Sequence, residues 1–170
     1  MTRRNRLRRV GILCCHFLRN LAFYEAGWKN GKLVFNDQFW INVNSNFLDI
    51  CVLEWYKLFG DKRGQHNWRK VITDQQAFLS GLLQAIGQTA GELDAYVEEM
   101  KTYRDKFVAH LDDENVMNIP KLRVARESVS FLYDYLLTNE EESNCFLDAP
   151  PSALRFYKKF SSQGQEVYSK

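Results

Sequence analysis

The sequence has little that could build a metal centre. Its 170 residues include only three histidines and four cysteines. No CxxC pair occurs and no histidine stands at ligand spacing from another histidine or cysteine; the residues are His16, His66, His110, Cys14, Cys15, Cys51 and Cys145. We therefore expect no metal and no other cofactor, and we expect reduced thiols in the helical core of a cytoplasmic protein.

Long apolar runs are also missing. The most apolar stretch near the N-terminus, VGILCCHFL, is nine residues long and ends at Arg19, whereas a membrane-spanning helix needs about 20 apolar residues. We expect no membrane span. The arginine-rich start is like a transit peptide in lacking acids, but it continues smoothly into an apolar periodic segment, so no targeting segment is expected.

Acidic residues are absent from residues 1–24, which hold six arginines and so carry +6. Because the whole chain carries +2, the remainder carries about −4. A basic segment on a mildly acidic body fits two readings. We favour a solvated start of the first helix; the alternative is a contact surface for an anionic partner such as RNA.

What the sequence does contain is apolar residues at helical spacing. This period predicts helices over residues 4–27, 36–60, 74–87, 89–111, 120–138 and 152–160, followed by a loose tail. Asn36 and Asp74 are predicted N-caps, and Thr89 with Glu92 predicts a capping box, in which each satisfies a backbone donor of the other. The pair Asn30-Gly31 predicts a turn.

No run alternates as a strand does, and no internal repeat is evident. An apolar content of 45% in 170 residues is enough for one domain with a real core. Short turns between long amphipathic helices favour an all-α fold built as an antiparallel bundle. The bundle is expected over residues 1–140, and residues 141–170 are expected to form an extension with one short helix.

The stretch YRDKFVAHLDDE, residues 103–114, carries the candidate chemistry. Six residues of an α-helix advance about 9 Å and turn about 600°, so Arg104 and His110 would point about 120° apart. Two arrangements could still bring them together: the chain can leave the helical path near His110, or a symmetric dimer can place both pairs in one cleft.

Residues 103–110, YRDKFVAH, resemble the R-x(4–6)-H signature of the HEPN superfamily (higher eukaryotes and prokaryotes nucleotide-binding domains), with Asp105 in its polar slot. The chain is especially similar to the branch associated with bacterial abortive-infection proteins, where an upstream helix ends in an apolar-aromatic run like VLEWYKLFGD, residues 52–61. The similarity covers about residues 10–138 in architecture and about a dozen residues in motif detail.

The resemblance implies an up-and-down four-helix bundle, with extra short helices here, that forms a homodimer through the motif helices. It also implies a metal-independent endoribonuclease that serves as a toxin or phage-defence effector, with an antitoxin protein as a further partner. His110 would exchange a proton with the 2′-hydroxyl or the leaving oxygen, Arg104 would hold the phosphate, and Asp105 would orient either side chain. Lys101 and Lys106 would help to bind RNA.

One position departs from the family pattern. Asp112 stands where some family toxins carry a tyrosine that a nucleotidyltransferase antitoxin modifies, so this form of control is not expected. Asp112 and Asp113 also place negative charge near the proposed phosphate site.

The alternative is a non-catalytic helical bundle that serves as a dimerisation or protein-interaction module. In that case His110 would interact with the helix C-terminus, and Arg104 would pair on the surface with Glu99, Asp105 or Asp112. In either case Tyr103 and Phe107, one turn apart, are expected to be core residues and not platforms for stacking bases.

Overall fold

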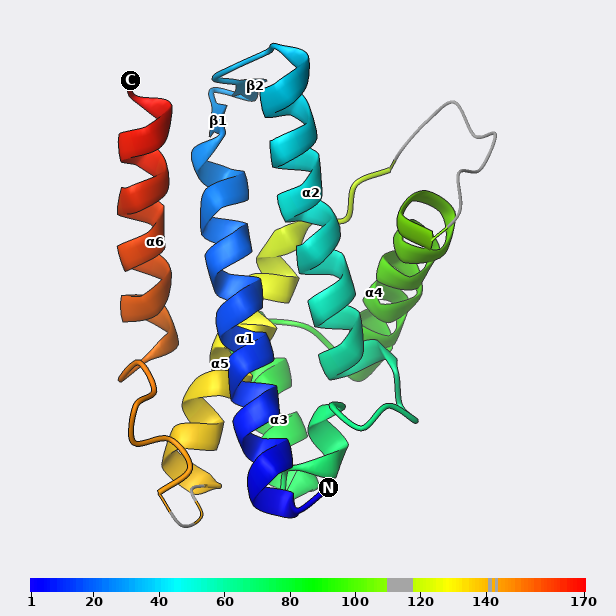
Figure 1. Cartoon of the computed structure of the whole chain (residues 1–170). Coiled ribbons are helices and arrows are strands. Elements are labelled where there is room, and N and C mark those ends of the chain that lie inside the picture. Colours follow the sequence, from blue (N-terminus) through cyan, green and yellow to red (C-terminus); the bar gives the residue numbers. More distant parts are fainter. Residues whose placement is uncertain (110–117, 141, 143) are drawn as a thin grey trace.

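The computed structural model describes residues 1–109, 118–140, 142 and 144–170. Within these residues the chain is all-α apart from one small hairpin, as the sequence predicts (Figure 1). The α-helices are α1 (Arg3–Ala26), α2 (Gln38–Trp55), α3 (Gln75–Ile86), α4 (Ala90–Tyr103), α5 (Leu122–Asn139) and α6 (Ala153–Tyr168). Two π-helical segments, η1 (Tyr56–Gly60) and η3 (Arg104–Ala109), continue α2 and α4, and a short 3₁₀ turn, η2 (Trp68–Lys70), precedes α3.

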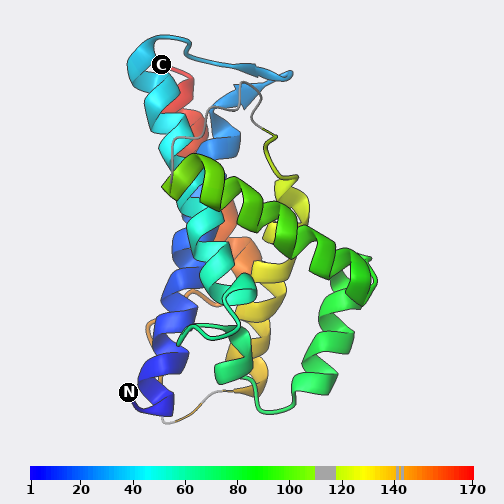
Figure 2. The same ribbon diagram turned by 90° about the vertical axis from the view of Figure 1, so that its right-hand side faces the viewer.

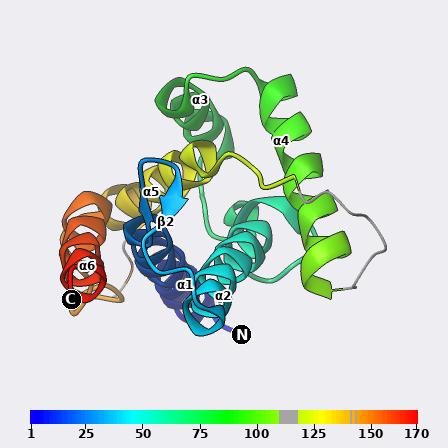
Figure 3. The ribbon, with the colours of Figure 1, turned by 90° about the horizontal axis from the view of Figure 1, so that it is seen from above.

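Helix α1 lies at the centre of the arrangement and packs against α2, α5 and α6. Helices α1 and α6 run in the same direction, while α2 and α5 run the opposite way (Figure 1). Helix α4 crosses α2 obliquely (Figure 2). Viewed along the bundle, α4 and α6 lie on opposite sides of the molecule (Figure 3).

Side-chain caps set most helix starts. The predicted caps are confirmed at Asp74, whose carboxylate accepts the Ala77 N–H at 2.9 Å, and at the Thr89–Glu92 capping box. The predicted cap at Asn36 is wrong by one residue, because Asp37 accepts the Trp40 N–H and α2 begins after it.

The Asn30-Gly31 turn is present, but it closes a hairpin that the sequence analysis did not predict. Strand β1 (Trp28–Lys29) pairs antiparallel with β2 (Lys32–Leu33), and each strand is only two residues long. Asn30 and Gly31 have φ of 52° and 74°, the left-handed conformation that a two-residue hairpin turn requires.

The predicted end of the last helix at residue 160 and the loose tail after it are wrong, because α6 continues to Tyr168. Tertiary packing holds the added turns in place. Gly164 lies so close to α1 that a Cβ there would come within 2.7 Å of the Ala26 Cβ. The Tyr168 ring stacks on Phe35 at 5.5 Å and lies 5.3 Å from Trp40.

The arginine-rich start is the first turns of α1, and part of it has a structural role. The Arg3 guanidinium donates to Glu140 and Glu142, both at 2.5 Å. Glu140, with a side chain only 3% exposed, also accepts the Thr73 N–H and hydroxyl, each at 2.7 Å. This cluster joins the start of α1, the segment before α3 and the end of α5.

We expect Glu140→Ala to lower the free energy of unfolding by about 2 kcal/mol, because the Thr73 donors and Arg3 lose a buried acceptor. Urea denaturation measures the change. Glu142→Ala is the matched control: it removes a second carboxylate from the same arginine, but the Glu142 side chain is 43% exposed and should matter by less than about 1 kcal/mol. Equal losses in the two variants would contradict this assignment.

Candidate functional site

The candidate site forms where two π-helical segments meet. Segment η3 begins with Arg104 and continues α4, and segment η1 begins with Tyr56 and continues α2. Such segments are rare and frequently mark functional sites, because they interrupt the regular hydrogen-bond ladder of a helix. The upstream run at residues 52–61 and the motif helix, singled out separately in the sequence, are therefore neighbours in the fold.

The Arg104 guanidinium is held from two sides. Its Cζ lies 3.8 Å from the centroid of the Tyr56 ring, a close cation–π contact. Its Nε donates to Asp105 Oδ1 at 2.7 Å, and Nη2 donates to the same oxygen. The Nη1 edge is not taken up by that carboxylate. The side chain is 26% exposed, so the guanidinium is fixed in place and still accessible.

The guanidinium of Arg104 stays protonated. Burial lowers its pKa, but the hydrogen bond from the guanidinium to Asp105, together with the charge of Asp105 and the contact with Tyr56, outweighs burial and raises the pKa overall. Arg104 is thus a permanent cation whose direction is set by its neighbours. Of the surface partners weighed for this arginine from the sequence, Asp105 is the one that the described residues show.

Lys101 lies next to this site but is not a free cation. Its Nζ is 3.7 Å from a Glu98 carboxylate oxygen. It lines a depression of about 680 Å³ that also includes Tyr56. The charged residues of that depression balance, with three acids and three bases: Asp61, Asp94, Glu98, Lys62, Arg63 and Lys101. Lys106, also proposed to bind RNA, is half-buried in η3 and is engaged in an interaction of its own.

His110 lies outside the described residues, as do Asp112 and Asp113. The structure therefore brings Arg104, Asp105 and Tyr56 together, while the distance from Arg104 to His110 stays a prediction. Tyr56 is the residue that the sequence analysis missed. The only signal for it was its place in the apolar-aromatic run at residues 52–61.

Tyr103, predicted to be a core residue, is buried. Its hydroxyl donates to Asp49 Oδ1 at 3.2 Å across the α2–α4 interface. Burial, followed by the charge of Asp49, raises the pKa of Tyr103 well above its ordinary value. Burial also raises the pKa of Asp49, against the hydrogen bond from Tyr103. The side chain of Phe107, the other predicted core ring, lies outside the described part of the chain.

Comparison with known proteins found no matching family model, no matching curated protein and no matching solved structure. Across the described residues, no helix is long and apolar enough to cross a membrane. The same residues contain no cluster of three or more histidine, cysteine or acidic side chains able to hold a metal ion.

The Tyr103–Asp49 contact predicts a pH dependence of stability. Because the pKa of Tyr103 is higher in the folded state, the unfolded chain loses the phenolic proton first as pH rises above about 10, and folding loses stability there. Tyr103→Phe should cost about 1 kcal/mol at pH 8 through the lost hydrogen bond. Above about pH 10 the deficit should shrink, since phenylalanine does not ionise.

Urea denaturation of the wild type and of Tyr103→Phe, at pH 8 and again above about pH 10, measures the difference in their free energies of unfolding. A deficit that stays constant across the alkaline range would show that Tyr103 ionises equally in both states.

Proposed function

We propose that this chain is a metal-independent endoribonuclease of the HEPN type that cleaves RNA with Arg104 and His110. One observation carries the proposal: the Arg104 guanidinium at the start of η3 is fixed between Tyr56 and Asp105, while 26% of the side chain stays exposed. A cation that is already oriented can stabilise charge on a phosphorane without reorganising during the reaction.

In this proposal the partly exposed guanidinium of Arg104 holds the scissile phosphate, and Asp105 is a positioning residue for the arginine. The 2′-oxygen attacks phosphorus and the 5′-oxygen leaves. His110 either accepts the 2′-hydroxyl proton or donates a proton to the 5′-oxygen, and a water molecule performs the other transfer; either role suits an imidazole near neutral pH. The products are a 2′,3′-cyclic phosphate and a 5′-hydroxyl, so the substrate is RNA and not DNA.

The proposal includes a homodimer formed through the motif helices, which would place two copies of the Arg104 and His110 pair in one cleft. It also includes the antiparallel four-helix bundle of the family. Helix α1 packs against α2 and against α5 and runs antiparallel to both, which supports that part. The biological role proposed with this activity is that of a toxin or phage-defence effector, with an antitoxin protein as a partner.

Arg104→Ala and His110→Ala should each lower the rate of RNA cleavage in EDTA by about 100-fold or more, because each removes a group that acts in the transition state. The measurement is cleavage of a labelled RNA, with the fragment ends analysed for a cyclic phosphate. Arg123→Ala and His66→Ala are matched controls. Arg123 lies exposed on α5 in a surface pair with Glu127, and His66 lies in the connector before α3; both should cleave normally.

Inactivity of the wild-type protein, or cleavage that survives both motif substitutions, would defeat the proposal. Equal inactivity of all variants would support the non-catalytic interaction module. Growth arrest on expression, relieved by Arg104→Ala but not by Arg123→Ala, would be independent support for a toxin.

Tyr56 is predicted to be a positioning residue that acts through Arg104. Tyr56→Leu should lower kcat/KM by about tenfold, because the cation loses the ring face on which it lies. Tyr56→Phe keeps that face and should stay within about threefold of the wild type. Steady-state kinetics test the pair, with urea denaturation to confirm that both variants fold. Equal losses of activity in folded Tyr56→Leu and Tyr56→Phe would rule out the ring face as the cause.

A further inference from the structure

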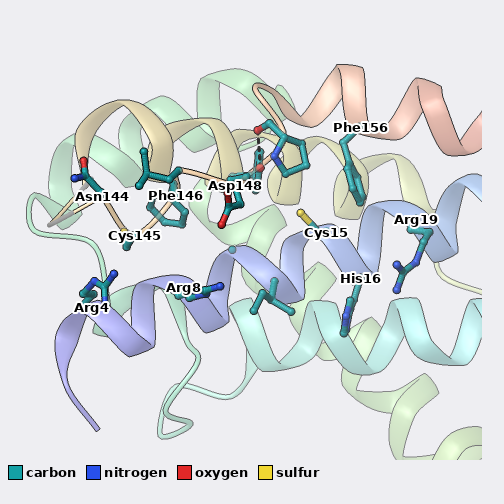
Figure 4. A pocket seen from close by; sticks show the side chains of 16 residues that line it. Arg4, Arg8, Cys15, His16, Arg19, Asn144, Cys145, Phe146, Asp148 and Phe156 are labelled. Atoms are coloured by element: carbon teal, nitrogen blue, oxygen red, sulfur yellow. Dashed lines mark hydrogen bonds between the residues drawn. The ribbon is translucent and has the colours of Figure 1, made fainter.

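A groove of about 520 Å³ lies between α1, the segment 144–150 and the start of α6 (Figure 4). We call it the α1 groove. Helix α1 contributes Arg4, Arg8, His16 and Arg19 to its lining. These residues recur at intervals of three, four or eight along the helix, so they share one face. Figure 3 places α6, which borders the groove, away from α4, which leads into η3 and Arg104.

The arginines of the groove differ from their neighbour Arg3. Arg3 is tied to two glutamates, whereas Arg4 and Arg8 are exposed and have no ion-pair partner among the residues that the structure describes. Asp148 is the single acid in the described lining. The groove therefore carries an excess of positive charge, and an anion bound there would not have to displace a carboxylate from Arg4 or Arg8.

Positive charge continues beyond the groove along the α1–α6 seam. The Arg19 Cζ and the Lys159 Nζ each lie 5.7 Å from the centroid of the Phe160 ring. Two cations therefore approach one ring from different helices. From Arg4 to Arg19 the helix advances about 22 Å, a length that exceeds a single mononucleotide and suits an extended strand.

The floor between these cations is apolar and partly aromatic. Gly11 lets the Phe146 ring lie directly on α1, since a Cβ there would be 2.9 Å from the Phe146 Cε1. Phe156 points from α6 toward α1 across the groove (Figure 4), and its ring centroid lies 4.8 Å from that of Phe160. Aromatic rings from the segment 144–150 and from α6 thus face the arginines of α1; Phe146 is buried, whereas Phe156 and Phe160 are partly exposed.

We infer that the α1 groove and its continuation at Phe160 bind single-stranded RNA independently of sequence. Proteins that hold single strands combine a positive groove for the phosphates with aromatic rings for the bases. Arginine suits this role because its fork binds a phosphate through two hydrogen bonds and its plane stacks on rings. The choice of RNA over another anionic strand rests on the proposed function. The geometry of the groove is independent of that proposal.

An acidic protein segment is the competing occupant, since it too would be attracted by the arginines. The rings favour nucleic acid. The carboxylates of an acidic helix would pair with the arginines but would not stack on aromatic rings, whereas every base has a π face that can stack.

The test measures fluorescence anisotropy of a labelled oligouridylate of about 15 nucleotides, titrated with His110→Ala protein in EDTA so that the probe stays intact. Adding Arg4→Glu and Arg8→Glu to this protein should weaken binding by about tenfold or more. The slope of log affinity against log salt concentration should become shallower by about 1.4. Both residues are exposed, so the fold should survive.

The matched control is Lys29→Glu with Lys32→Glu, which makes the same change in charge at two exposed residues of the hairpin. It should bind with nearly wild-type affinity. Phe156→Leu, which keeps an apolar side chain but removes the flat face, should weaken binding by about fivefold.

Absence of binding, or equal losses in the arginine and lysine variants, would overturn the inference. So would tighter binding of an oligoglutamate peptide of equal charge that is lost in the arginine variant, which would make the groove a protein-docking surface. The outcome is separable from the proposed function. Groove-dependent binding without any wild-type cleavage would leave the inference standing alone, and cleavage with unchanged binding in the arginine variant would remove only the inference.

Discussion

The structure depends on one buried hydrogen bond, from the Trp55 indole Nε1 to the Ser128 Oγ at 2.9 Å. Trp55 is fully buried at the end of α2, and its ring stacks on Phe59 and meets Tyr96 edge-on. A buried indole N–H needs an acceptor, so one registration of α2 against α4 and α5 is favoured over neighbouring ones. Tyr56 follows Trp55 directly, and the position of its ring under Arg104 is set by this anchor.

The candidate site therefore has its cation on one helix and its support on another. Asp105 is local to Arg104, but the ring beneath the guanidinium comes from η1, a segment almost fifty positions earlier in the chain. Both π-helical segments end α-helices that the core holds firmly. A guanidinium fixed in this way has little conformational freedom left to lose on binding an anion.

Local signals in the sequence predicted the helices and two of their caps, because periodicity, Asp74 and the Thr89–Glu92 box act within a few residues. Features that depend on distant contacts could not be read in this way. The last turns of α6 are polar, and they are helical because Gly164 fits against α1. Likewise, Arg104 and Asp105 were chosen from a motif, but nothing near them in sequence points to Tyr56.

The pairing of α1 with α6 has a consequence for synthesis. The Tyr157 hydroxyl donates to a Glu25 carboxylate that is 132 residues away in sequence. At ribosomal rates of roughly 5–20 residues per second, about 7 to 26 seconds pass between the synthesis of Glu25 and that of Tyr157. During translation the Phe23 ring lacks its contact with Phe160, so this apolar face of α1 stays uncovered until α6 has been synthesised.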